Sequence, residues 1–443
     1  METIAGLPFF PLEITKDGKI FNPAQKSAIE AAISDAAATK LTDLFVVSHG
    51  WNNDMADARQ LYQELFTNVA SRIASHSPAK DHKFAIVGIF WPSKRFADEE
   101  LIPGGGAASI EDEAPTITSS AVRTKLEGLK GTFDVPDEVT LEQAKSLVDA
   151  LEDNPANQKK FVDLIRSLLP QHPTDKADDA SDVFMGRPGD EVLKALAPPS
   201  SFVAQPPGDG SDGASLDLDD QAGAAAGVAD AFSGMGAAAW RLLNFATYYQ
   251  MKERAGVVGS GVNTMLASVR QLRPDLRVHL IGHSFGARVV TAAVDGQAAL
   301  RPSSLTLLQG AFSHNGFTEK FDNRNDGFFR KVIAKSKVSG PIVVTHTIND
   351  RAVGIAYPIA SRLSADNASA LGDENDVYGG LGRNGAVKMK PAEFIKGQLL
   401  PETSSYQLVA GKVHNLRADQ FIAGHSDVTG RQVANAIVHA VMS

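Results

Sequence analysis

The residues with the clearest chemical potential in this chain are Gly282-His283-Ser284-Phe285-Gly286, its only match to the pattern Gly-x-Ser-x-Gly. A serine hydroxyl can act as a nucleophile when a neighbouring base takes its proton. The apolar run "RVHLIG" precedes the serine, and the alanine- and valine-rich run "ARVVTAAVDGQ" follows it. These runs predict a strand and then a helix, so we expect Ser284 at the sharp turn between them.

The two glycines that flank Ser284 have a steric reason to be there. A sharp strand-to-helix turn strains the backbone of the nucleophile and brings other chain segments close, so side chains at the glycine positions would clash. The N-terminus of the following helix adds a positive potential that suits a developing oxyanion. The alternative interpretation is a glycine-rich turn around a buried serine that has no chemical role.

A second stretch, "VVSHGWNND", ends an earlier apolar run with His49-Gly50-Trp51. In a nucleophile-elbow architecture, a loop after such a strand supplies one backbone N–H of the oxyanion hole, and the residue after the nucleophile supplies the other. In this chain those N–H groups would belong to Trp51 and Phe285. The imidazole of His49 has no part in that chemistry, so we expect it to pack beneath the loop.

The two motifs together resemble the α/β-hydrolase superfamily, whose serine hydrolases include lipases, esterases and some peptidases. The resemblance covers about residues 8–98 and 240–443 and implies a catalytic triad in the chain order Ser, Asp or Glu, His. The chain departs from the family pattern because Trp-Asn-Asn, rather than further glycines, follows His49-Gly50. Bulky acyl groups would therefore have less room beside the oxyanion hole.

Asp350 is the candidate for the acid of the triad. A catalytic acid should follow the carboxyl end of a sheet strand, where α/β sheets place their sites. The apolar run "PIVVTHTIND" ends in Asp350 and meets this condition. Its alternative role is that of a turn or helix-capping residue. The other aspartates considered lie in polar loops: Asp322, Asp326, Asp366, Asp373 and Asp376.

His425 is the candidate for the base, because "FIAGHSDVTG" lies between the last expected strand and the last helix, where the superfamily carries its base. It would deprotonate Ser284 and then protonate the leaving group, while Asp350 holds the imidazole in one tautomer. The alternative is a loop histidine that stabilises the start of the helix. His283 adjoins the serine and is expected to point elsewhere. The remaining histidines lie too early in the chain, within strands or in the last helix: His314, His346, His414 and His439.

Apolar runs and amphipathic segments alternate along the chain. "FFPLEITKDGKIF" predicts a hairpin around Asp17-Gly18, and Asn22-Pro23 predicts the start of a helix that runs to about residue 39. Further strands are expected at residues 43–50, 83–91, 277–282, 304–312, 340–350 and 406–416, and helices at 58–73, 238–256, 261–272, 287–297 and 428–442. This alternation predicts an α/β fold with a doubly wound, mostly parallel sheet.

Residues 99–239 are expected to be an insertion into a core formed by residues 1–98 and 240–443. The insertion holds 26 acidic and 10 basic residues, a net charge of −16, whereas the rest of the chain carries +7. Within it, "LEQAKSLVDALEDNPANQKKFVDLIRSLLP" predicts one or two amphipathic helices, and the Pro/Gly/Asp/Ala-rich residues after them predict a flexible linker. "DGSDG" and "DLDD" lack the ligand spacing of an EF-hand. Because the insertion follows a sheet strand, we expect an acidic cap over Ser284 that disfavours anionic substrates.

Composition limits the class of protein further. The 443 residues are 43% hydrophobic and 21% charged, as is typical of folded globular proteins. No apolar run approaches the roughly 18 residues that cross a bilayer, and no signal-peptide pattern opens the sequence. We therefore expect a cytoplasmic protein, with signal-independent export left open. The absence of cysteine excludes disulfides, thiolate zinc sites and a cysteine nucleophile. A basic footprint for nucleic acid is missing.

The resemblance thus implies an esterase- or lipase-like serine hydrolase that cleaves small-molecule carboxylic esters through an acyl-enzyme intermediate. A peptidase or amidase on the same fold remains open, and so does a non-catalytic binding protein that keeps the fold. A triad and two backbone N–H groups suffice for the chemistry, so no metal or organic cofactor is expected. Natural substrate, acyl chain length and oligomeric state are not indicated by these patterns.

Overall fold

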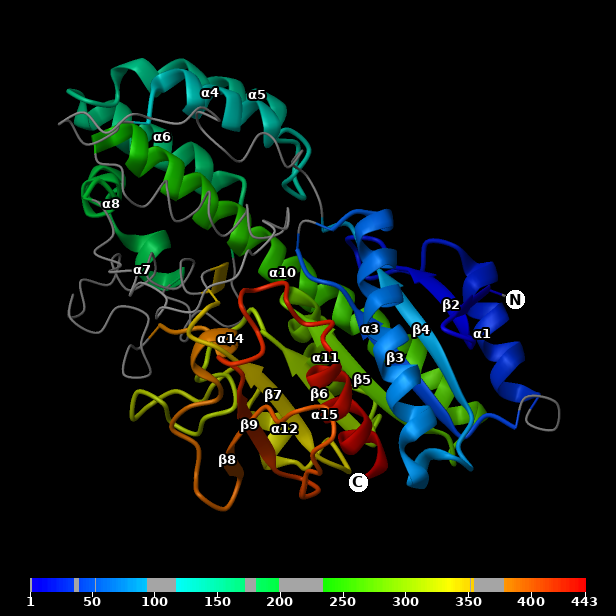
Figure 1. Cartoon of the computed structure of the whole chain (residues 1–443). Helices are drawn as coiled ribbons and strands as arrows, with labels where there is room; N and C mark the ends of the chain where they lie inside the picture. Colours follow the sequence, from blue (N-terminus) through cyan, green and yellow to red (C-terminus); the bar gives the residue numbers. More distant parts are fainter. Residues whose placement is uncertain are drawn as a thin grey trace, which may run out of the picture. The chain divides into compact units, whose positions relative to one another are not determined.

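The computed structural model describes residues 2–35, 40–51, 53–93, 117–171, 181–198, 234–350, 352–353 and 378–443 (Figure 1). The chain divides into two compact units. The first comprises residues 1–94, 251–353 and 373–443, and the second comprises residues 95–250 and 354–372. The strands named below and the candidate site residues all belong to the first unit.

The first unit is built on a nine-stranded sheet with the order β1-β2-β4-β3-β5-β6-β7-β9-β8. Neighbouring strands run parallel, except for the antiparallel pair of β1 and β2. The central strands are continuous apolar runs because both faces of the sheet are covered. The bounds are β1 Glu2–Ile4, β2 Leu7–Glu13, β3 Asp43–Ser48, β4 Phe84–Phe90, β5 Arg277–His283, β6 Ser304–Leu308, β7 Ile342–His346, β8 Phe394–Gln398 and β9 Val413–Arg417. The expectation of an α/β fold with a mostly parallel sheet is confirmed.

Helices lie on both faces of this sheet (Figure 1). α3 (Met55–Ser75) and α15 (Arg431–Met442) pack against each other and share one apolar core with the strands. α11 (Phe285–Asp295) packs against β3, β5 and β6. Further helices of the unit are α1 Pro23–Ser34, η1 Ser77–Ala79, α12 Arg330–Ala334 and α14 Leu381–Asn384.

The connections of β3 and β5 leave in opposite directions. β3 continues through α3 to β4 on one side, and β5 continues through α11 to β6 on the other. Because such crossovers are right-handed, the two helices cover opposite faces of the sheet. A crevice then opens at the carboxyl ends of the two strands, which is where open α/β sheets bind their ligands. The loops after β3 and β5 contain His49-Gly50-Trp51 and Ser284.

The second unit is helical in its described part. It contains α4 Ser119–Gly128, α5 Glu138–Leu147, η3 Val148–Ala150, α6 Pro155–Ser167, α7 Ser181–Gly186 and α8 Gly189–Leu196. The expected helices at residues 141–169 are α5 and α6, whose apolar faces are buried, whereas α4, α7 and α8 were not anticipated. The expected linker falls mostly in residues 199–233, which lie outside the described residues.

Several element boundaries differ from the sequence expectation. The turn at Asp17-Gly18 forms, with Gly18 at φ +73°, but its second arm is a single bridge from Ile14 to Ile20, and β2 pairs instead with β1. α1 begins as expected after Asn22, whose side chain accepts from Ala24 N, but ends at Ser34. The two helices expected at residues 238–272 are one helix, α10 (Gly234–Leu272). Strand β9 is shorter than expected, and the exposed edge strand β8 was missed because its lysine, glycine and glutamine lack an apolar pattern.

A buried polar network joins the first residues of the central strands. The Asp43 carboxylate lies 2.9 Å from His279 Nε2 and 2.6 Å from His82 Nδ1, and His279 Nδ1 lies 2.9 Å from Ser304 Oγ. Asp43 and His279 are completely buried. Burial raises the pKa of Asp43, but hydrogen bonds from His279, Thr42 and His82 outweigh it and leave the pKa lowered. The carboxylate is therefore the common partner of Thr42 just before β3, His279 of β5 and His82 in the loop before β4.

Among the described residues, no helix combines the length and apolar character that a membrane span requires.

Replacing Asp43 by alanine should lower the free energy of unfolding by about 3 kcal/mol, because a buried ionic network loses the partner on which it converges. Urea denaturation of wild type and variant measures the difference. Asp81→Ala is the matched control, since Asp81 is exposed and lies next to His82, and it should change stability by less than about 0.5 kcal/mol. Equal effects of the two substitutions would contradict the central role of Asp43.

Candidate active site

Ser284 lies at the turn between β5 and α11 in a strained backbone conformation, with φ 54° and ψ −124°. Non-glycine residues rarely adopt such angles, and they persist only where surrounding structure enforces them. In this protein, β6 and the loop that follows it hold the backbone of Ser284 in this conformation. Ser284 N donates to Leu308 O at 3.0 Å, and Ser284 O accepts from Ala311 N at 3.0 Å. The geometry is that of a nucleophile elbow.

Three glycines make this elbow sterically possible. A Cβ on Gly282 would lie 2.3 Å from Gly286 O, and one on Gly286 would lie 2.1 Å from Ser48 O. The third glycine is Gly50, where a Cβ would approach Ser284 Cβ to 2.6 Å and Ser284 Oγ to 3.1 Å. The loop after β3 therefore lies directly against the serine. Sequence reasoning gave the two flanking glycines a steric role but did not assign one to Gly50.

Asp350 and His425 are brought together from loops 75 positions apart in the chain. His425 Nδ1 donates to Asp350 Oδ2 at 2.9 Å. The carboxylate is completely buried, whereas the imidazole is 18% exposed. Val353 N donates to Asp350 Oδ1 at 3.0 Å. One carboxylate oxygen is thus held by backbone while the other faces the imidazole, as an orienting acid requires.

The strand before Asp350 ends earlier than the sequence indicated. β7 ends at His346, so Asp350 lies in the following loop rather than at the last strand position. That loop is tied to the loop after β9 by Asp419, whose Oδ1 accepts from Thr347 Oγ1 at 2.9 Å and from Ile348 N at 3.0 Å. Asn349 Nδ2 adds a bond to Ile422 O at 2.9 Å. These bonds align the two loops that carry Asp350 and His425.

Asp419 was missed in the sequence because nothing in its neighbourhood marks an aspartate that bonds to a distant loop. Asp427 has a local role within the same segment, since its Oδ2 accepts from Ala423 N at 2.9 Å. The loop that carries His425 is therefore closed on itself by Asp427 and attached to the loop after β7 by Asp419.

His49 is buried beneath the loop after β3, in the place expected for it. Its Nε2 accepts from Trp91 N at 3.3 Å, so Nδ1 carries the proton and donates to Gly50 O at 2.9 Å. The ring stacks on Trp91 with 5.7 Å between centroids. Burial lowers the pKa of His49 to about 4. The neutral imidazole thus fixes the backbone of Gly50, which touches Ser284.

Trp51 and Phe285, the residues expected to supply the oxyanion N–H groups, lie next to each other. Their rings meet edge to face with 6.2 Å between centroids. Phe285 is the first residue of α11 and follows Ser284 directly. Ser284 is 5% exposed and lies at the same turn. The described residues thus include a serine at a strained turn, two neighbouring aromatic residues and an acid–imidazole pair in the loops that follow β3, β5, β7 and β9.

The other candidate residues have structural partners elsewhere. His414 Nε2 accepts from Val409 N at 2.9 Å, and His439 packs against His76 with 4.9 Å between ring centroids. Asp322 and Asp326 bond to backbone N–H groups of their own loop. His314 is buried beside Asn384, and His346 ends β7. The remaining aspartates, Asp366, Asp373 and Asp376, lie outside the described residues.

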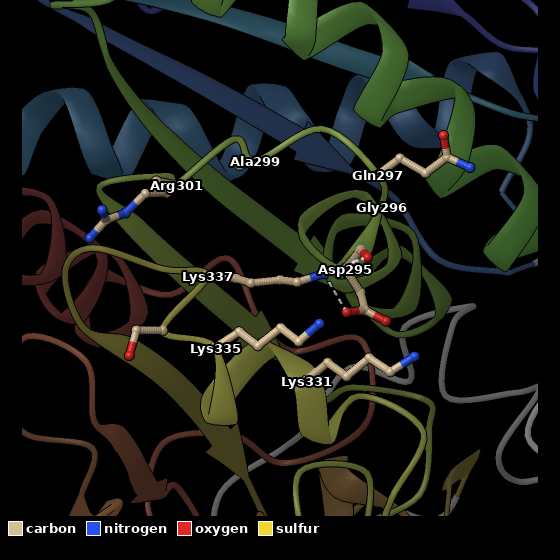
Figure 2. A pocket seen from close by; sticks show the side chains of 9 residues that line it. Asp295, Gly296, Gln297, Ala299, Arg301, Lys331, Lys335 and Lys337 are labelled. Atoms are coloured by element: carbon tan, nitrogen blue, oxygen red, sulfur yellow. Dashed lines mark hydrogen bonds and ion pairs between the residues drawn. The ribbon is translucent and has the colours of Figure 1, made fainter.

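A surface hollow of about 580 Å³ lies at the other end of α11 (Figure 2). Lys331, Lys335, Lys337 and Asp295 line it. Lys337 Nζ donates to the carbonyl oxygen of Asp295 at 2.6 Å and to its carboxylate at 2.7 Å. A cation at the last carbonyls of a helix stabilises its C-terminus. Lys337 and Asp295 therefore have a capping role, at the opposite end of the helix from Ser284.

The described part of the chain contains no group of three histidine, aspartate or glutamate side chains that could bind a metal ion.

Comparison with known proteins found no matching family model, no similar curated protein and no similar solved structure.

The buried neutral state of His49 predicts a pH dependence of stability. Its pKa is about 4 in the folded protein and about 6.5 when unfolded, so the unfolded chain binds the proton first as the pH falls. The free energy of unfolding should therefore decrease below pH 6.5, with a contribution from His49 of about 3 kcal/mol by pH 4.

Urea denaturation of wild type and His49→Asn between pH 7.5 and pH 4.5 measures this contribution. Asparagine can replace the bond from Nδ1 to Gly50 O but does not titrate, so the variant should lose stability less steeply with falling pH. Parallel curves for the two proteins would show that His49 is not held neutral.

Proposed function

We propose that this protein is a serine hydrolase that cleaves carboxylic esters, with Ser284 as nucleophile, His425 as general base and Asp350 as the acid that orients the base. The observation that carries the proposal is the 2.9 Å bond between His425 Nδ1 and buried Asp350, at the sheet edge where Ser284 occupies a strained elbow. The bond leaves Nε2 of the imidazole as the nitrogen that can accept a proton.

The reaction would proceed through an acyl-enzyme. Ser284 Oγ attacks the ester carbonyl carbon while His425 Nε2 takes the hydroxyl proton, and the carbonyl oxygen becomes an oxyanion that accepts hydrogen bonds from Trp51 N–H and Phe285 N–H. Collapse of the intermediate breaks the bond to the alkoxy oxygen, and His425 delivers its proton to the departing alcohol. Water then attacks the acyl-enzyme in the same way, which releases the carboxylic acid and restores the serine.

We propose in addition that the first unit has the α/β-hydrolase fold. The α/β-hydrolase fold is supported by the mostly parallel sheet, by the elbow after β5 and by the His-Gly loop after β3, the loop from which that fold takes an oxyanion N–H. We further propose that the acidic inserted segment is a cap. It is supported by the separate packing of the second unit and by the departure of the chain after β4 at the carboxyl edge of the sheet, the edge of Ser284.

Esters are favoured over amides only by the resemblance, so the substrate class needs a direct test. A panel of p-nitrophenyl esters of graded acyl length, with p-nitroanilide and peptide substrates beside them, separates an esterase from an amidase or peptidase. Labelling by a fluorophosphonate, which reacts with activated serines, separates both enzymes from a non-catalytic binding protein. Hydrolysis of the anilides at rates equal to the esters would contradict the ester assignment.

Ser284→Ala should lower kcat by about 10⁴-fold or more and abolish fluorophosphonate labelling, because the nucleophilic oxygen is lost. The melting temperature should stay close to that of wild type, since only one hydroxyl is removed. Kinetics on the most reactive ester, and mass spectrometry of the labelled peptide, provide the measurements. Near-wild-type activity, or labelling at another serine, would overturn the assignment.

His425→Ala should also remove most of the activity, with residual catalysis from the oxyanion N–H groups. His414→Ala is the matched control, because His414 is a strand histidine whose partner is the backbone of Val409. The control should lose stability but keep its kcat. If His414→Ala were the inactive variant and His425→Ala the active one, the base would be misassigned.

A further inference from the structure

His283 makes a hydrogen bond that the proposed mechanism does not use. Its Nε2 lies 2.9 Å from the carbonyl oxygen of His425, and the two imidazole rings are 5.0 Å apart between centroids. A carbonyl oxygen can only accept, so Nε2 carries the proton and Nδ1 carries the lone pair. The last residue of β5 is thereby bonded to the backbone of the residue that carries the candidate base.

This bond excludes other roles for His283. Nε2 already carries a proton, and Nδ1, the nitrogen with the lone pair, is buried without a hydrogen-bond partner among the described residues, so it does not bond to Ser284 Oγ. His283 is therefore not placed as the base. The pKa of His283 is lowered to about 3, first by burial and second by the charge of the nearby His425. His283 is therefore neutral at ordinary pH and places no like charge beside the imidazolium that forms on His425.

The stability of the fold does not explain a histidine at this position. His283 Nδ1 is buried and has no hydrogen-bond partner among the described residues. A buried acceptor without a partner destabilises a protein, whereas an apolar side chain of similar size would avoid that cost. What distinguishes histidine from an apolar residue at this strand end is the bond from Nε2 to His425 O.

We propose that His283 is a positioning residue, which holds the backbone of His425 so that its imidazole stays within reach of Ser284. The proposal rests on the proposed function. His425 lies in the loop between β9 and α15, and its bond to Asp350 fixes the ring at Nδ1. With the backbone bonded to His283, the base is held from β5 as well as from the loop after β7. Small displacements of a catalytic group can lower a rate about 100-fold.

Three substitutions of His283 separate positioning from packing. Glutamine can place an amide N–H near the position of Nε2, asparagine reaches only to the position of Nδ1, and leucine has no donor. We expect His283→Leu and His283→Asn to lower kcat by about 10- to 100-fold while KM changes less than about twofold. His283→Gln should retain kcat within about threefold of wild type. His283→Leu should melt no lower than wild type, since it removes the buried Nδ1.

The measurements are kcat and KM on a short p-nitrophenyl ester, the rate of fluorophosphonate labelling at Ser284 and the melting temperature. His414→Leu is the control for the loss of a strand histidine and should leave kcat unchanged. A leucine variant with wild-type kcat would overturn the positioning role, and so would a glutamine variant as impaired as the leucine variant. If wild type itself were neither labelled nor active, the proposed function would fall and the positioning role with it.

Discussion

The candidate site depends on the close approach of two backbone turns, one after β3 and one after β5. Gly50 lies against Ser284, and Gly286 lies against Ser48, at distances that leave no room for a Cβ on either glycine. The approach is possible because β3 and β5 are neighbours in the sheet while their connections leave to opposite sides. It brings the loop that carries Trp51 beside the serine.

Buried neutral histidines bond to the backbone near this approach. His49 and His283 each donate from one ring nitrogen to a backbone carbonyl, of Gly50 and of His425, and burial lowers the pKa of both. His279 is buried with a lowered pKa at the other end of β5, between Asp43 and Ser304. An imidazole without charge can be buried and still offer a donor and an acceptor. The imidazole of His425, by contrast, is partly exposed.

The positions of Asp350 and His425 are set by loops rather than by strands. Asp350 and His425 both lie beyond the ends of their strands, and Asp419 joins the two loops through Thr347 and the backbone of Ile348. Gly382 packs directly against the carboxylate of Asp350, since a Cβ on this glycine would lie 2.7 Å from Asp350 Oδ2. Loops carry many functional residues, and they can hold them accurately only when tertiary bonds of this kind restrain them.

The sequence by itself determined the features that depend on local pattern. Alternating apolar runs and amphipathic segments predicted the mostly parallel sheet, and Asn22-Pro23 predicted the start of α1, because strand burial and helix capping are encoded by neighbouring residues. The glycines around Ser284 predicted a sharp turn for the same reason. Edge strand β8 and the continuity of α10 escaped prediction, since neither has a distinguishing local pattern.

Tertiary structure alone decided which distant groups meet. Three such contacts join residues far apart in the chain. Gly50 lies against Ser284, Asp419 bonds to the loop of Asp350, and His283 bonds to His425. The spacing of residues along a sequence carries no information on such pairs, because the distance between them is set by the order of strands in the sheet and by the path of the loops. For that reason the sequence shows His283 only as the neighbour of Ser284, whereas in the folded protein its hydrogen-bond partner is the backbone of His425.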